Sequence, residues 1–185
     1  MRPENNDLAV RVWDPFVRIF HWSLVACVAF NFFVDDDGET IHQLIGYLTT
    51  ALVLARIMWG FVGSPYARFA SFFPTPTRLR THLAALRAGK HDFQPGHNPF
   101  GALMMLALMA LVLALGLSGF LQTTDAFWGS KWLEEIHEGL ATALITLATI
   151  HAAAAIIMSR LEGVNLIQAM ITGIQRRRGT GTNGH

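Results

Sequence analysis

Four histidines lie inside long apolar stretches of this 185-residue chain, and they are the residues best suited to chemistry. They are His21, His42, His137 and His151. An ionisable side chain within an apolar membrane segment is energetically expensive and marks a functional site by default. A single buried histidine can instead be a satisfied hydrogen-bonding residue of the core. Four histidines whose depths match in pairs favour ligands to a cofactor.

The spacing of these histidines predicts two separate levels. His137 and His151 are fourteen residues apart, which is close to four helical turns and about 21 Å along a helix axis. Both rings then face the same side of one helix, but one metal ion cannot bind both. His42 lies at the start of the second apolar segment, at the same level as His137. His21 lies near the level of His151. Two stacked cofactors, each held by facing helices, fit this pattern.

The donor set indicates the kind of cofactor. Zinc prefers four ligands held closely together, often including cysteine. Two histidines per level, with apolar neighbours and no carboxylate cluster, suit the two axial positions of a haem iron. We therefore expect one haem between His42 and His137 and a second between His21 and His151. A haem-free transporter or proton conductor with histidine relays is the alternative.

Two arginines are candidates to bind the haem propionates. Arg56 follows His42 by fourteen residues, so it projects from nearly the same helix face at the level of His21 and His151. An unpaired guanidinium there would be costly, and a propionate would supply a bidentate anionic partner. Arg18, one turn before His21, could serve likewise. The alternative for both is a side chain that extends to the membrane surface.

The elements that position these residues are membrane helices. The chain is 52% hydrophobic and 15% charged, and its apolar residues gather into four segments. Each is long enough to cross a hydrocarbon layer of roughly 30 Å, which requires about 20 helical residues. The segments are 15–34, 42–62, 99–121 and 136–158. We predict an all-α integral membrane protein, an up-down bundle of four transmembrane helices in which residues 1–185 form a single membrane domain. Asn98 is expected to cap the third helix, with Pro99 in its first turn.

Two shorter segments are expected to lie at the membrane surface. Residues 76–89 form a short amphipathic helix on the inner side, and residues 164–178 form a second amphipathic segment that ends in arginines.

A signal peptide is the alternative reading of the first apolar segment, but no small-residue cleavage site follows it. The single cysteine, Cys27, excludes an internal disulfide, a cysteine-ligated cluster and a C-x-x-C-H haem attachment.

The distribution of basic residues predicts the orientation of the bundle. Twelve of the fourteen Lys and Arg residues lie in the N-terminal segment, in the loop between the second and third helices, or in the tail. Such residues stay on the cytoplasmic side, so both termini are expected in the cytoplasm. The outer connections, around 35–39 and 123–135, are acidic and could attract a basic external partner, or could simply be solvated loops. His42 and His137 then form the outer pair, and His21 and His151 the inner pair.

Four phrases of the sequence carry a family resemblance. In order they are "RVWDPFVRIFHW", "LARIMWGFVGSPYARFASF", "GHNPFGALMM" and "NLIQAMITG". Placed around four membrane helices, they resemble the bacterial cytochrome b561 family, which includes the cytochrome b subunits of nickel–iron hydrogenases. The resemblance implies non-covalently bound haem b with histidine axial ligands. The four histidines named above match the ligand positions of that family.

The resemblance also implies a function in the bacterial inner membrane. We expect a dihaem cytochrome that transfers electrons between quinone or quinol and a redox partner such as a cytochrome c or a hydrogenase. Whether the protein is itself a quinol-linked oxidoreductase is left open. Alternatives are a haem-bearing anchor for a hydrogenase or dehydrogenase, and a quinone-linked superoxide oxidase, whose anionic substrate the acidic outer face would repel. Four tryptophans could flank a quinone or form the interfacial belt: Trp22, Trp59, Trp128 and Trp132. Membrane lipid is an expected partner and nucleic acid is not; a homodimer is left open.

Overall fold

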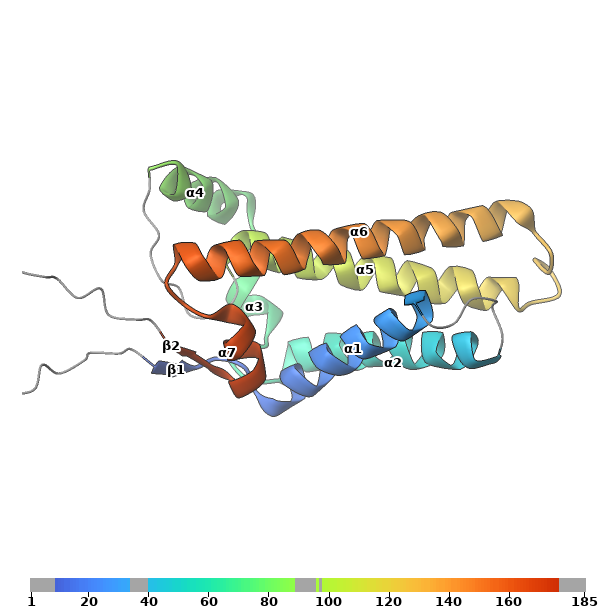
Figure 1. The fold of residues 1–185 in the computed structure, drawn as a ribbon, viewed down its shortest axis with the longest axis horizontal. Helices are drawn as coiled ribbons and strands as arrows, with labels where there is room; N and C mark the ends of the chain where they lie inside the picture. The colour runs from blue at the N-terminus through green and yellow to red at the C-terminus, as the bar shows by residue number, and fades with distance from the viewer. Residues whose placement is uncertain (1–8, 34–39, 89–95, 97, 177–185) are drawn as a thin grey trace, which may run out of the picture.

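Four long helices run side by side in the computed structural model, which describes residues 9–33, 40–88, 96 and 98–176 (Figure 1). They are α1 (Pro15–Phe33), α2 (Thr40–Val62), α5 (Pro99–Gln122) and α6 (Lys131–Leu161). All four are long and apolar enough to cross a membrane. The predicted bundle of four transmembrane helices is thereby confirmed.

Side-chain caps fix where two of these helices begin. The Val17 N–H donates to Asp14 Oδ1 at 2.9 Å, immediately before Pro15 opens α1. The Gly101 N–H donates to Asn98 Oδ1 at 2.7 Å, and a proline occupies the first turn of α5. Proline is pre-organised for the first helical turn, where its missing N–H is no loss. The predicted cap at Asn98 is confirmed, whereas the cap at Asp14 was not foreseen.

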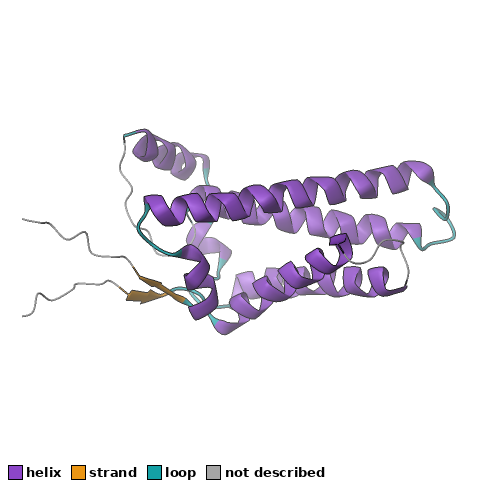
Figure 2. Cartoon of the chain, viewed as in Figure 1, coloured by secondary structure: helices purple, strands orange, loops and turns teal. Residues whose placement is uncertain are grey.

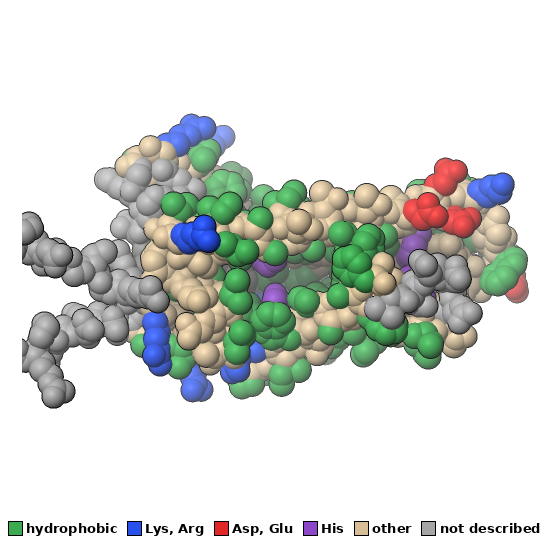
Figure 3. All heavy atoms as spheres, in the orientation of Figure 1, with side chains coloured by type: hydrophobic (Ala, Val, Ile, Leu, Met, Phe, Trp, Pro, Cys, Tyr) green, Lys and Arg blue, Asp and Glu red, His purple; other side chains and the backbone are tan. Residues whose placement is uncertain are grey.

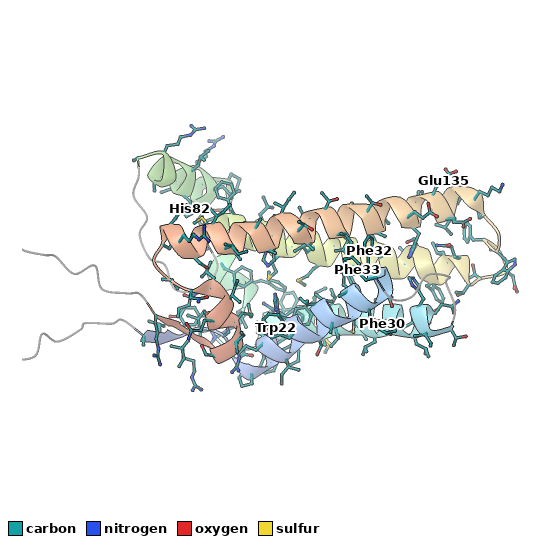
Figure 4. The ribbon with its side chains drawn as sticks, in the orientation of Figure 1. Trp22, Phe30, Phe32, Phe33, His82 and Glu135 are labelled. Atoms are coloured by element: carbon teal, nitrogen blue, oxygen red, sulfur yellow. The ribbon has the colours of Figure 1, made fainter. Side chains whose placement is uncertain are left out.

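Helix α6 is longer than the apolar segment that predicted it. It spans Lys131–Leu161, 31 residues, rather than 136–158, and is therefore about 46 Å long. The hydrocarbon layer is only about 30 Å thick. The extra turns at its start carry lysine and glutamates, which are good helix formers but contribute nothing to an apolar run. Figure 4 shows Glu135 projecting from this start of the helix.

The helices pack as a row rather than as a closed ring. Helix α1 packs on α2, α2 on α5, and α5 on α6. Among the described residues, neither α1 nor α2 makes extensive close contacts with α6. One apolar core joins the row from within, and all four helices contribute to it: Phe20, Val53, Met109, Val112 and Leu144.

The short elements gather at one end of the bundle. Strands β1 (Ala9–Arg11) and β2 (Ile174–Arg176) pair antiparallel, with Val10 opposite Gln175 (Figure 2). Helices α3 (Phe69–Phe72), α4 (Pro76–Arg87) and α7 (Leu166–Thr172) lie at the same end. We call this the ribbon end, and the opposite end, where α1 joins α2 and α5 joins α6, the hairpin end.

The predicted amphipathic segment 164–178 contains helix α7 and strand β2. Helix α7 stops at Thr172 because Gly173 adopts a left-handed conformation (φ 83°) that caps it. The Gly173 carbonyl accepts hydrogen bonds from the N–H groups of Val12 and Trp13 at 2.9 and 3.1 Å. These hydrogen bonds hold Gly173 against residues 12 and 13, and β2 begins at the next residue. The predicted helix at 76–89 is present as α4; positions 34–39, 89 and 177–178 lie outside the described residues.

Candidate cofactor-binding site

His42 and His137 face each other at the hairpin end. His42 lies in the first turn of α2 and His137 in the second turn of α6. Their ring centroids are 6.2 Å apart and their planes cross at 64°. Two imidazoles that bind one metal from opposite sides, each at a metal–nitrogen distance of about 2 Å, place their ring centres roughly 6 Å apart. The spacing therefore fits a shared axial site.

A cavity of about 530 Å³ surrounds this pair. All four long helices contribute residues to its walls, and so does the α5–α6 connection at Trp128 and Gly129. Its size falls within the range of about 300–1,000 Å³ that is usual for bound ligands. The walls are mostly apolar, as at Val28, Val112, Leu115 and Leu144, but they also carry polar side chains, including Asn31, Gln43, Thr49, Thr50 and Glu134. The histidine pair and Gly46, Gly116 and Gly119 line it as well.

Three glycines near this pair have different roles. A Cβ at Gly119 would lie 3.3 Å from His137 Cε1, so its absence leaves room for the ring. A Cβ at Gly116 would collide with the Thr50 side chain, so this glycine permits close packing of α5 on α2. A Cβ at Gly46 would project into the cavity and meet only the Asn31 amide, at 3.9 Å.

Ser118 is a functional candidate that the sequence reasoning missed. Its Oγ lies 2.9 Å from His137 Nδ1, and its side chain is buried at 5% exposure. A signal for it existed in the sequence. In an antiparallel helix pair, a residue shortly before the end of the first helix lies level with one shortly after the start of the second. Ser118 and His137 stand in this relation across the α5–α6 connection.

His21 of α1 and His151 of α6 are the second pair predicted from the sequence. His21 Nδ1 is buried and has no hydrogen-bond partner among the described residues, and its ring stands edge-on to Trp22 at 5.2 Å. Figure 3 shows histidine side chains at two separate levels, one of them inside the hollow between α1 and α6. A buried ring nitrogen without a hydrogen-bond partner is costly, and in an intramembrane histidine it marks a functional position.

Arg56 is buried rather than extended to the membrane surface. It is 1% exposed. Its Nη2 donates to the Ala67 carbonyl at 3.1 Å, and its guanidinium lies 5.6 Å from the centre of the Phe69 ring. Its Nη1 is buried without a hydrogen-bond partner in the described part of the chain. A buried guanidinium with an open donor is suited to bind an anion.

Arg18 connects α1 to α7. Its Nη2 donates to the Ile171 carbonyl, near the C-terminal end of α7 where such carbonyls lack helical partners. Trp22 reaches the same short helix, because its Nε1 lies 3.4 Å from the Met170 carbonyl. Arg18 thus has a structural partner at the ribbon end, while its Nε lacks one among the described residues.

Asp14 organises a hydrogen-bond network where α1 begins and α2 ends. Its Oδ2 accepts from Trp59 Nε1 at 3.0 Å and from Ser64 Oγ at 2.5 Å. Burial alone would raise the pKa of this carboxyl. The hydrogen bonds from Ser64, the Val17 N–H and Trp59, with the nearby Arg56 charge, outweigh burial and hold the pKa below its usual 3.8.

The four tryptophans divide between the two ends. Trp59 and Trp22 are engaged in the ribbon-end contacts just described. Trp128 and Trp132 at the hairpin end are exposed at 78% and 55%, as expected of a membrane-interface belt. In the described parts of the chain, no three His, Cys, Asp or Glu side chains cluster as a metal-ion site.

Comparison with known proteins gives a family match over most of the chain. A family model described as prokaryotic cytochrome b561 matches residues 12–173. Two similar curated proteins, from Escherichia coli (strain K12) and Escherichia coli O157:H7, are both named "Probable Ni/Fe-hydrogenase 1 B-type cytochrome subunit". Each is 26% identical over 145 residues, which cover 63% of this chain and 61% of the relative. The match thus spans less than two thirds of these relatives' length. No solved structure matches the chain.

Proposed function

The chain belongs to the prokaryotic cytochrome b561 family, and we propose that it is a dihaem b-type cytochrome that carries electrons across the membrane between the quinone pool and a redox protein. The family is one of membrane-bound b-type cytochromes, which implies haem b as the cofactor. The observation that carries the proposal is the separation of 6.2 Å between the His42 and His137 ring centroids, inside an apolar cavity.

The four histidines have the same proposed role at two levels. His42 and His137 hold one iron at the hairpin end, and His21 and His151 hold another towards the ribbon end. When bound, haem b supplies reversible one-electron transfer between ferric and ferrous iron. With two imidazoles on each iron, no coordination position would remain for oxygen or substrate. The protein's residues then fix the position of each cofactor and tune its potential.

Two arginines are proposed to meet the propionates. Arg56 is buried and keeps Nη1 available, so a carboxylate there would satisfy a donor that is otherwise costly to bury. Arg18 has Nε available, while its Nη2 is committed to Ile171. On this proposal the two arginines contribute more to cofactor orientation than to the electron transfer itself.

We also propose a location in the bacterial inner membrane with the ribbon end in the cytoplasm. Most lysines and arginines visible in Figure 3 lie at the ribbon end, whereas the acidic side chains gather at the hairpin end. This asymmetry follows the rule that basic residues remain on the cytoplasmic side. The hairpin end would then face an external redox partner.

A second candidate function is a haem-bearing anchor subunit that passes electrons from a docked enzyme into the membrane. The printed names of the two relatives, which describe a hydrogenase cytochrome subunit, favour it. Purification from native membranes separates the candidates. Co-purification of a large redox enzyme supports the anchor, whereas quinol-dependent reduction of a small cytochrome by the isolated chain supports independent function.

A pyridine haemochrome assay on detergent-purified protein tests the dihaem proposal. We expect close to two haem b per chain in the wild type and close to one in either His42→Ala or His151→Ala. His82→Ala is the matched control, because His82 lies on α4, which is not one of the four long helices, and its ring packs on Phe100. This variant should keep both haems (Figure 4). A correctly folded but colourless wild type would refute the proposal.

A further inference from the structure

We propose that Ser118 is a positioning residue for His137: its hydroxyl fixes the proton on Nδ1 and the angle of the ring, and so tunes the haem site at the hairpin end. This inference rests on the proposed function, because it assigns a role toward a haem ligand. It concerns the hydrogen bond between Ser118 Oγ and His137 Nδ1, which measures 2.9 Å.

The hydrogen bonds of Ser118 determine which atom donates. A hydroxyl has one proton to donate and lone pairs to accept with. Ser118 Oγ lies 3.1 Å from the carbonyl of Leu115, one turn earlier in α5, and donates its proton there. Toward His137, Oγ can then only accept a hydrogen bond. This arrangement favours the Nδ1–H of the imidazole as the donor, which leaves Nε2 without a proton.

This tautomer is the one that a metal ligand requires. A neutral imidazole with its proton on Nδ1 offers the Nε2 lone pair to a metal. The opposite arrangement, in which the hydroxyl donates to Nδ1, would place the proton on Nε2 and block ligation. Because the Ser118 hydroxyl donates to the Leu115 carbonyl, the tautomer with its proton on Nδ1 is favoured before any cofactor is bound.

The same residue restricts rotation of the His137 ring. Ser118 is only 5% exposed and lies on a rigid helix. Its neighbour Gly119 brings the α5 backbone against the ring, because a Cβ there would lie 3.3 Å from Cε1. Rotation of the ring would break the hydrogen bond or collide with α5. The contact thus maintains the 64° angle between the His137 and His42 planes.

The hydrogen bond also has an electronic consequence. An acceptor on the distal N–H makes the coordinating nitrogen a stronger donor. A stronger donor stabilises ferric iron relative to ferrous iron and lowers the reduction potential. His21 at the other level has no partner for its buried Nδ1 among the described residues. Ser118 therefore makes the hairpin-end level electronically distinct from the ribbon-end level.

Three variants test this inference: Ser118→Ala, Ser118→Thr and Thr146→Ala. Ser118→Ala removes the acceptor, and Ser118→Thr retains a hydroxyl. Thr146→Ala is the matched control, because its Oγ1 bonds only the Thr142 carbonyl on an exposed face of α6. The measurements are haem content, the two midpoint potentials from a redox titration, and the ferric EPR spectrum, which reports the angle between the axial rings.

The expected result is specific to one haem. Ser118→Ala should keep both haems, shift the hairpin-end potential to more positive values and change that haem's EPR signal. Ser118→Thr and Thr146→Ala should resemble the wild type. Selective loss of the hairpin-end haem in Ser118→Ala but not in Ser118→Thr would also support the role, because the hydroxyl then holds the ligand.

Two results would overturn the inference. One is a Ser118→Ala protein with both haems and unchanged potentials and EPR signals. The other is loss of the haem from both serine variants, which would make side-chain packing, not the hydroxyl, the cause. A colourless wild type would overturn the proposed function itself and this inference with it, so the two failures are distinguishable.

Discussion

The four intramembrane histidines have different immediate surroundings, although the sequence presents them as equivalents. His137 is hydrogen-bonded by Ser118 and lies against Gly119. His21 stands edge-on to Trp22 and leaves Nδ1 without a partner in the described region. Because each ring is held by different neighbours, a substitution beside one histidine should affect one haem and leave the other intact.

Gly119→Ala is expected to weaken the haem site at the hairpin end. The added methyl would lie 3.3 Å from His137 Cε1, and the backbone of α5 cannot easily withdraw. Overpacking of this kind costs about 1–3 kcal/mol, so haem affinity should fall roughly tenfold. Haem transfer to an acceptor protein measures the effect. Gly139→Ala is the control, since a Cβ at Gly139 meets nothing within 4 Å; equal haem loss in both variants would contradict the prediction.

Asp14 gives a prediction about acid stability. Its carboxyl has a pKa below the usual 3.8 in the folded chain. Its contribution is therefore complete at pH values above 3.8 and is lost as the pH falls below that value through the lowered pKa. Asp14→Ala should cost about 1–2 kcal/mol at neutral pH through the lost cap and hydrogen bonds.

Thermal unfolding in detergent, measured at neutral pH and in acid, tests this prediction. Asp14→Asn retains a capping oxygen without the charge, so it should be destabilised less than Asp14→Ala. Both variants should lose less stability than the wild type on acidification. An unchanged acid dependence in both variants would show that other carboxyl groups dominate.

The sequence predicted the residues that carry strong signals and missed those that depend on tertiary neighbours. Intramembrane histidines stand out because their burial is costly, and the rings of His42 and His137 lie 6.2 Å apart in the structure. Ser118 is an ordinary residue in an apolar helix until the ring of His137 lies beside it. Asp14 could have been recognised as a cap before Pro15, but its bonds to Trp59 and Ser64 span 45 and 50 residues.

Among the elements, the apolar helices were predictable, whereas the polar start of α6 and the β1–β2 ribbon were not. The predicted segment 42–62 corresponds to Thr40–Val62, and 99–121 to Pro99–Gln122. Hydropathy locates such helices because the membrane demands a fixed apolar length. It cannot detect the polar first turns of α6, nor a two-stranded ribbon whose strands are more than 160 positions apart in the chain.

Gly173→Ala should destabilise the contacts at the ribbon end. The residue has φ 83°, and a Cβ there would lie 2.6 Å from the Trp13 carbonyl oxygen. Gly163→Ala is the matched control, because Gly163 also has positive φ (66°) but a Cβ would meet nothing within 4 Å. We expect about 1 kcal/mol of destabilisation at Gly163 from backbone strain alone, and roughly 2–4 kcal/mol at Gly173.

Hydrogen exchange at the Val12 and Trp13 amides reports on this element directly, since both donate to the Gly173 carbonyl. Exchange at these two amides should rise in Gly173→Ala and remain near the wild-type rate in Gly163→Ala. If both variants exchange at the same rate, positive φ rather than the close approach to Trp13 explains the effect.

At the scale of the whole molecule, the proposed haem sites connect helices that otherwise contact each other little. The helices form the row α1, α2, α5, α6. Each histidine pair joins α6 to a non-neighbour in this row: His42 on α2 at one level, and His21 on α1 at the other. Because a ligand that binds only the folded state stabilises it, both cofactors should hold α6 against the α1–α2 pair.

Loss of both haems should therefore loosen α6 without unfolding the bundle. The test is electron–electron distance measurement on spin labels in a Cys27→Ser chain, with one label at Ile19→Cys on α1 and one at Ile156→Cys on α6. Both side chains are exposed, at 68% and 45%. In a variant combining His42→Ala and His151→Ala, the α1–α6 distance distribution should broaden towards longer values.

A second label pair makes this result specific to the helix row. Ile19→Cys with Met58→Cys reports on α1 and α2, which pack directly, and Met58 is 70% exposed. Its distance distribution should be the same with and without haem, because the apolar cluster that includes Phe20 of α1 and Val53 of α2 remains. An unchanged α1–α6 distribution would mean that the apolar core alone sets the position of α6. Broadening of both distributions would instead indicate general unfolding.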